Sequence, residues 1–317
     1  VKQSRERVLG IRALVGDGAG LRTAVTSTSD LSDAVALALA DDTVELARAT
    51  APDPYAGIPK DGFAENLPEL SLFDPADREL GVDSLIASAR EAESAARGAD
   101  PRIENSEGSE SSCEFVTVSY GNSEGFFGSY EAAAHGLFSM PIAADRGEMQ
   151  TDYWSTAARR QRDLEPAGAV GSEAARRALR RLGSRRVPTC EVPVVFEAAT
   201  ARSLVSHLTS CITGGAIYRK TSFLADALSR QIASPLVHII DDGRRPGGLG
   251  SKPFDGEGQA TRRTAVVSGG TLENFHLYSY AARKLDMAPT GSPARSPGGR
   301  PGASATNIWL EPGDRSL

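Results

Sequence analysis

The sequence is poor in cysteine and histidine and has no long apolar run. Its 317 residues include three cysteines and four histidines, and no uninterrupted apolar stretch approaches the roughly 18 residues that a membrane helix requires. Cys113, Cys190 and Cys211 are widely spaced, odd in number and never form a C-x-x-C pair. These scarcities argue against a membrane protein, a disulfide scaffold and a cysteine-only zinc site. They favour a reducing, cytoplasmic compartment.

The charge balance is mildly acidic. Lys and Arg total 35 against 41 Asp and Glu, which gives a formal net charge of -6. This acidic balance argues against a protein that binds nucleic acid mainly through its phosphates. One dense basic run stands out, at 176–186. An RNA or phosphopeptide surface on this run is one reading, and a solvated helix face is the favoured one because no aromatic residues interleave. The run contains Arg176, Arg177, Arg180, Arg181, Arg185 and Arg186.

The first part of the chain predicts helices packed on a mainly antiparallel sheet. Two apolar segments around a Gly-rich turn predict a hairpin over 8–29, and the P-loop pattern is missing there. Helical spacing predicts helices over about 30–50, 81–98 and 170–183, with Ser29 or Asp30 capping the first and Ser172 the third. Alternating Val, Phe and Tyr between 113 and 144 predict a meander, and one more strand is expected near 148–159.

The pattern changes near Val187, where we place a domain boundary. Residues 1–186 are then an N-terminal α+β domain, and 187–317 are a C-terminal domain that is mostly β with one or two helices. The segment EVPVVFEAA (191–199) predicts a short buried strand. It is followed by a helix that carries His207 and Cys211, and SPLVHIIDDG (234–243) predicts another strand.

Few residues form a pattern with recognisable chemistry. His207 and Cys211 share a helix face, but two ligands do not make a zinc site, and packing is the favoured reading. Asp241, Asp255 and Glu257 are carboxylates in or beside turns, and turn formation is favoured over acid–base catalysis or cation binding. The histidines have no spacing that establishes a Ser-His-Asp triad.

Many ordered segments across nearly the whole chain nevertheless resemble the TldD/PmbA family. Those segments are AARGADPRIENSEG, NSEGFFGSY, MQTDYWSTAAR, VGSEAARRALRRLGSRRVPT, PVVFEAATARSLVSHLTSCITGGAIYRKTSFL, GLGSKPFDGEG, YSYAARKL and TNIWLEPG. The resemblance implies two kinds of subunit that associate. TldD-like subunits are zinc peptidases with a helical H-E-x-x-x-H motif, whereas PmbA-like (TldE-like) subunits lack that motif.

The equivalent segment in this chain is HLTSCI. His207 keeps the first histidine position, Leu208 stands at the general-base position, and Ile212 stands at the second histidine position. Leu cannot act as a base and Ile cannot bind a metal. We therefore expect a PmbA-like subunit with no catalytic or metal-binding residue of its own, and with zinc in a TldD-like partner.

The resemblance implies a partner role in a dimer, with a TldD-like subunit or with a second copy, that acts on unstructured or modified peptides. Thr306, Asn307, Ile308 and Trp309 lie in a strand-like segment expected to pair with an extended substrate. Two alternatives stay open: a non-proteolytic module that regulates a DNA-associated enzyme, and a solitary enzyme that uses Asp241, Asp255, Glu257 or His276. Set beside the family, the chain is expected to be truncated at both ends.

Overall fold

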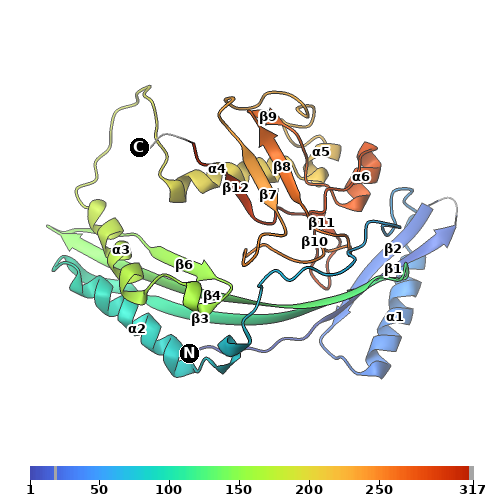
Figure 1. Cartoon of the computed structure of the whole chain (residues 1–317), viewed down its shortest axis with the longest axis horizontal. Coiled ribbons are helices and arrows are strands. Elements are labelled where there is room, and N and C mark those ends of the chain that lie inside the picture. Colours follow the sequence, from blue (N-terminus) through green and yellow to red (C-terminus); the bar gives the residue numbers. More distant parts are fainter. Residues whose placement is uncertain (18–19, 314–317) are drawn as a thin grey trace.

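The computed structural model describes residues 1–17 and 20–313 (Figure 1). At the N-terminal end, β1 (Leu9–Asp17) and β2 (Gly20–Thr28) form the predicted antiparallel hairpin, and α1 (Asp33–Arg48) packs on it through Ala13, Ala24 and Ala47. The helix begins later than predicted. The Asp30 carboxylate accepts the N–H of Ser32 at 2.9 Å, so Asp30 shapes the turn before the helix and does not cap it.

A second layer of two helices lies on a sheet. Its strands are β3 (Ile103–Gly121), β4 (Phe127–Asp145), β5 (Glu148–Thr151) and β6 (Trp154–Ala158), where β4 pairs with all three others. The helices are α2 (Val82–Gly98) and α3 (Ala167–Arg180). They approach so closely that a Cβ on Gly171 would collide with the carbonyl oxygen of Ala92.

Two sequence expectations for this layer need correction. The single strand expected near 148–159 is two strands, β5 and β6, which pair with different parts of β4. Helix α3 begins at Ala167 after Pro166 and not at Ser172, so Ser172 lies inside the helix. Proline fits this start because its missing N–H is not needed there.

The chain from 181 to 197 is irregular, and the buried strand predicted within 191–199 was wrong. Val192, Val194 and Val195 are 59%, 66% and 73% exposed, and no strand among the described residues pairs with this segment. An apolar run forms a strand only beside a partner edge, and Pro193 removes one ladder donor. The predicted boundary near Val187 falls in this segment and stays a prediction.

The residues from 198 onward form a separate α+β unit around one apolar core. Helix α4 (Ala198–Cys211) and α5 (Gly214–Tyr218) precede the strands β7 (Ile239–Asp242), β8 (Arg263–Ser268), β9 (Thr271–Leu272) and β12 (Ile308–Leu310). The strand order is β12-β7-β8-β9, with antiparallel neighbours. The α6 helix (Ser279–Leu285) and a small pair, β10 (Pro293–Ala294) with β11 (Gly302–Ala303), complete it. The α+β class with antiparallel sheets is confirmed.

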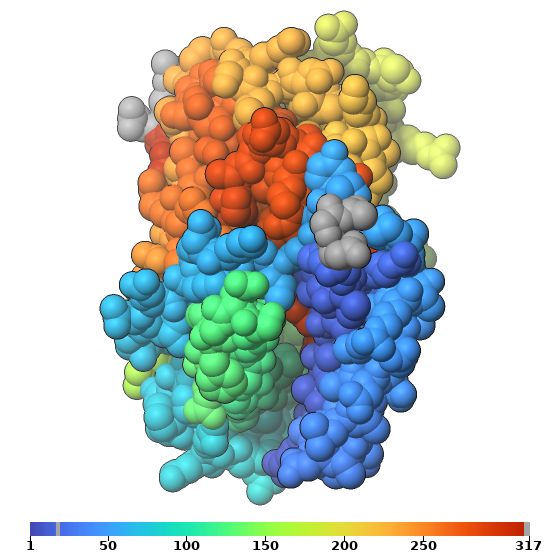
Figure 2. All heavy atoms as spheres, turned by 90° about the vertical axis from the view of Figure 1, so that its right-hand side faces the viewer, coloured from blue at the N-terminus to red at the C-terminus, as the bar shows by residue number. Residues whose placement is uncertain are grey.

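The loop from 49 to 74, which leads into the short 3-10 turn η1 (Pro75–Glu79), ties the two parts together. Tyr280 Oη donates to Asp53 at 2.8 Å, and Arg283 Nε donates to the carbonyl of Tyr55 at 2.7 Å. Figure 2 shows this side of the molecule, where the blue N-terminal segments lie against the orange and red C-terminal part. A second connection comes from the sheet layer, where Arg159 Nε donates to the carbonyl of Gly248 at 3.2 Å. Arg159 lies between β6 and the 3-10 turn η2 (Gln161–Asp163).

Candidate functional site

Helix α4 and its C-cap carry the three positions that the resemblance equates with the H-E-x-x-x-H motif. His207 is exposed, and its Nδ1 lies 2.6 Å from the carbonyl oxygen of Ser203 in the same helix. Leu208 is partly buried against the apolar core, and Ile212 is 0% exposed inside it. The three side chains therefore do not converge on one point, since one faces solvent and two face the core.

These residues do not fit a zinc ion. Leu208 and Ile212 offer no lone pair, and His207 with the partly buried Cys211 would supply two donors where a zinc site needs at least three. Across residues 1–17 and 20–313, no group of three or more His, Cys, Asp or Glu side chains is placed to hold a metal ion.

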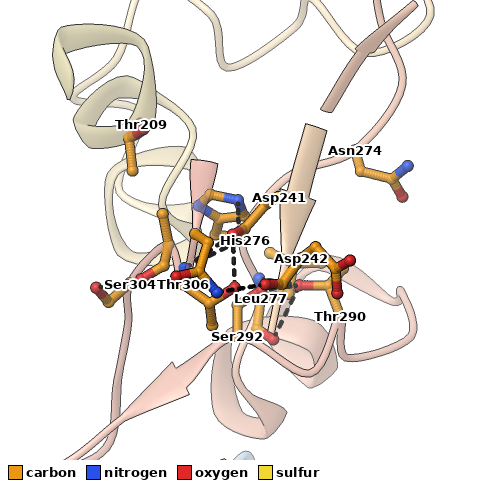
Figure 3. A network of polar contacts seen from close by, with 12 residues as sticks. Thr209, Asp241, Asp242, Asn274, His276, Leu277, Thr290, Ser292, Ser304 and Thr306 are labelled. Atoms are coloured by element: carbon orange, nitrogen blue, oxygen red, sulfur yellow. Dashed lines mark hydrogen bonds and ion pairs between the residues drawn. The ribbon is translucent and has the colours of Figure 1, made fainter. Parts of the chain in front are cut away.

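A buried polar network lies beside the end of α4 (Figure 3). Asp241 on β7 is 3% exposed and His276 is 0% exposed, with 3.4 Å between His276 Nε2 and Asp241 Oδ2. Burial lowers the pKa of His276, and the Asp241 charge partly opposes this. The Asp241 carboxylate also accepts the N–H of Thr306 at 2.9 Å and its hydroxyl at 2.6 Å. Asp241 thus fixes the segment that enters β12.

The predicted substrate-binding residues divide into inward and outward groups. Thr306 holds Asp241, and Asn307 Nδ2 donates to the carbonyl of Asp242 at 2.6 Å and to Ser251 Oγ at 2.8 Å. Ile308 packs against the apolar core. Trp309 lies on the opposite side of the strand from Ile308, with the Arg245 guanidinium 5.4 Å from its ring centroid.

The outer edge of β12 presents backbone groups. Asp242 N donates to Asn307 O and Glu311 N donates to His238 O, both at 2.9 Å, so residues 307 and 311 face β7. In an antiparallel ladder the residues between alternate, so Ile308 and Leu310 direct their N–H and C=O away from β7. No strand in the described part of the chain pairs with that edge.

Asp255 and Glu257 are buried, and their carboxylates accept hydrogen bonds from backbone N–H groups. Each is 2% exposed. Asp255 Oδ1 accepts the N–H of Glu257 at 2.8 Å and of Gln259 at 3.0 Å, and burial raises the pKa of Asp255 to about 7. Glu257 accepts the N–H of Ser279 at 2.8 Å and its hydroxyl at 2.6 Å, at the start of α6. The favoured turn role is confirmed for Asp255, whereas Glu257 accepts hydrogen bonds at the start of α6.

The arginine run is partly neutralised by nearby carboxylates. Arg176 pairs with Glu173 at 2.6 Å, and Arg177 pairs with Glu197 at 2.6 Å. Arg181 lies 3.8 Å from Asp152. Such pairing is what the solvated-face reading predicts, and it leaves less free positive charge for phosphates.

Models of known protein families identify the family of this α+β chain. The PmbA/TldA metallopeptidase central domain matches residues 75–182, and the PmbA/TldA metallopeptidase C-terminal domain matches residues 189–317. The chain belongs to the PmbA/TldD family.

Curated relatives agree with this assignment. Metalloprotease PmbA of Escherichia coli O157:H7 is 39% identical over 85% of this chain and 60% of its own length. The Metalloprotease PmbA homolog of Haemophilus influenzae is 34% identical over 92% of this chain and 63% of its own length. The chain therefore spans about three fifths of the length of these relatives.

Solved structures share the fold. A Bacteroides thetaiotaomicron protein described as a proposed modulator of DNA gyrase has a TM-score of 0.84 at 23% identity, over 98% of this chain and 71% of its own. TldE of Thermococcus kodakarensis has a TM-score of 0.78 at 19% identity, over 93% of this chain and 66% of its own. Among the described residues of our chain, no helix has the length and apolarity needed to cross a bilayer.

Proposed function

We propose that this chain is a PmbA/TldE-like subunit that holds extended peptides for a TldD-like zinc peptidase and has no zinc site of its own. The observation that carries the proposal is the packing of α4. Its positions for the base and the second histidine are Leu208 and Ile212, and both are part of the apolar core. In the proposed complex, zinc and the general base come from the TldD-like partner.

The outer edge of β12 supports the peptide-binding half of the proposal. Ile308 and Leu310 direct N–H and C=O groups away from β7, so an extended peptide can add as one more strand by main-chain hydrogen bonds. Such pairing depends little on side chains, which suits unstructured or modified peptides. Asp241 and Asn307 hold the strand from the inner side.

Peptide hydrolysis tests whether this chain binds the peptide while a TldD-like partner cleaves it. We expect the purified chain with excess zinc to be inactive on unfolded peptides, and activity to appear with a TldD-like partner. Robust hydrolysis by the chain alone, unchanged by His207→Ala, would refute the proposal.

Substitution at one position tests the strand edge. Leu310→Pro removes an N–H that faces away from β7 and keeps the β7 ladder, whereas Leu310→Ala is the matched control that keeps the N–H. We expect Leu310→Pro to weaken binding of a fluorescent extended peptide by about threefold to tenfold, the value of one hydrogen bond of about 0.5–1.5 kcal/mol. Equal binding by both variants would argue against strand addition at this edge.

A further inference from the structure

An arginine, Arg245, stacks on the Trp309 ring of β12. Arg245 lies in the loop between β7 and β8, and its guanidinium covers the ring of Trp309 at 5.4 Å. The side chain is exposed. An arginine stacked on tryptophan keeps its donors directed outward while the ring limits its conformations, so less entropy is lost when a carboxylate binds.

Hydrogen bonds fix this loop to β12. Ser251 Oγ donates to the carbonyl of Arg245 at 2.5 Å and accepts Asn307 Nδ2 at 2.8 Å. The N–H of Gly250 donates to Asn307 Oδ1 at 2.8 Å. Asn307 therefore sets the position of the Arg245 backbone relative to the strand.

The charges around Arg245 leave its guanidinium available. The described part of the chain contains no carboxylate within ion-pair distance of it, and Glu311, which lies on the same side of β12 as Trp309, is paired with Arg263 at 3.4 Å. Arg244 is a second exposed arginine next in sequence. Within the described residues, the charge of the Arg245 guanidinium is therefore not neutralised by an ion pair.

Register places a substrate side chain next to this arginine. Since Ile308 and Leu310 make the outward hydrogen bonds, a residue opposite Trp309 in an antiparallel peptide forms a pair without direct hydrogen bonds. Side chains in such pairs lie closest together. The side chain at that position would meet the Trp309 ring and the Arg245 guanidinium.

We infer that Arg245, supported by Trp309, is a specificity-determining residue that favours Asp or Glu at the peptide position opposite Trp309. This inference rests on the proposed peptide binding at β12 and adds the chemistry of the preferred peptide. Arg245 contacts the peptide and takes no part in bond cleavage.

The test compares two labelled peptides by fluorescence anisotropy on the full chain. The peptides are β-prone decamers with no other charged side chain that differ only in one central residue, Glu or Gln. We expect wild type to bind the Glu peptide about threefold to fivefold more tightly, as for an exposed ion pair. The preference should shrink at about 1 M salt, where charges more than roughly 3 Å apart are screened.

Variants assign the preference to one residue. Arg245→Gln should bind both peptides equally, Arg245→Lys should keep part of the preference, and the matched control Arg244→Gln should keep most of it. Since Arg245 is exposed, circular dichroism should show all three variants folded. Equal binding of the two peptides by wild type, or a preference unchanged in Arg245→Gln, overturns the inference while leaving the proposed function intact. Failure of wild type to bind either peptide overturns both.

Discussion

Restoring a histidine at the motif position should destabilise the protein and should not create a zinc site. The perturbation is Ile212→His, which returns the second histidine of the H-E-x-x-x-H pattern. Ile212 is 0% exposed and packs among the apolar residues of the C-terminal core. The imidazole would replace an aliphatic side chain in a place with no partner for its nitrogens.

The expected cost follows from burial. Losing a fully buried isoleucine costs about 1.5–3 kcal/mol of apolar transfer free energy. Burying an imidazole without a hydrogen-bond partner adds about 1–3 kcal/mol. The total, about 2.5–6 kcal/mol, is a large share of the roughly 5–15 kcal/mol by which a domain is stable. At about 2–4 °C per kcal/mol, the melting temperature should fall by roughly 5–24 °C.

Thermal unfolding with and without zinc measures the change in melting temperature of Ile212→His. Leu204→His is the matched control, because Leu204 is on the same helix and 53% exposed. A surface change of this kind should cost about 0.5 kcal/mol or less. If Ile212→His melted at the same temperature as wild type, or if zinc raised its melting temperature in proportion to stoichiometric binding, the packing argument for an altered motif would be wrong.

Three further changes probe the buried polar groups and the helix contact. Asp255→Asn keeps the turn acceptor but cannot ionise. Since the folded pKa of Asp255 is raised to about 7, wild type should lose stability as pH rises from about 4 to 7. At about 1.4 kcal/mol per pKa unit, the variant should be more stable above pH 7 by up to about 4 kcal/mol in urea titrations. Thr306→Val removes one hydrogen bond to the Asp241 carboxylate and should lower the free energy of unfolding by about 1–3 kcal/mol, whereas Thr306→Ser should retain most of it. Gly171→Ala should destabilise the protein despite its better helix propensity, because the new Cβ would collide with the Ala92 carbonyl oxygen. In the control Gly168→Ala, in the same helix, the Cβ meets only Glu91 Oε1 at 3.6 Å, so this variant should be neutral or stabilising by up to about 1 kcal/mol. Melting temperatures distinguish the two variants.

Local sequence patterns predicted the elements whose signals are local. The hairpin over 9–28, α2 and α4 follow from turn chemistry and helical spacing, and the structure places them close to the expected residues. The strand expected at 191–199 failed because strand formation depends on a partner edge, and no composition rule reports where that edge lies. Tertiary context decided the outcome there.

The candidate site could be predicted from the sequence only in part, for the same reason. Thr306 and Trp309 were predicted as substrate-binding residues from a strand-like segment, but which of them faces the sheet interior depends on the register with β7. Register assigns Thr306 to Asp241 and leaves Trp309 beside Arg245. Arg245 was missed, since GRRPGG is typical of a turn and its partner Trp309 is 64 positions further along the chain.

The altered motif and the strand edge are connected through His276. Its backbone N–H donates to the carbonyl of Ile212 at 3.0 Å, and its carbonyl accepts the N–H of Gly214 at 2.7 Å, so it is attached to the end of α4. Its ring contacts Asp241, which holds Thr306 at the start of β12. The position that we expect to be equivalent to the second histidine is therefore three contacts from the start of β12: Ile212 to His276, His276 to Asp241, and Asp241 to Thr306. Under the proposal, Leu208 at the position of the base and Ile212 at the position of the second histidine contribute apolar core at the helix end, and the polar contacts that position the edge are present beside them. Under the proposed function, a subunit with this arrangement would lack the groups for cleavage and would keep those for holding a peptide, which is the combination that the proposed partner role requires.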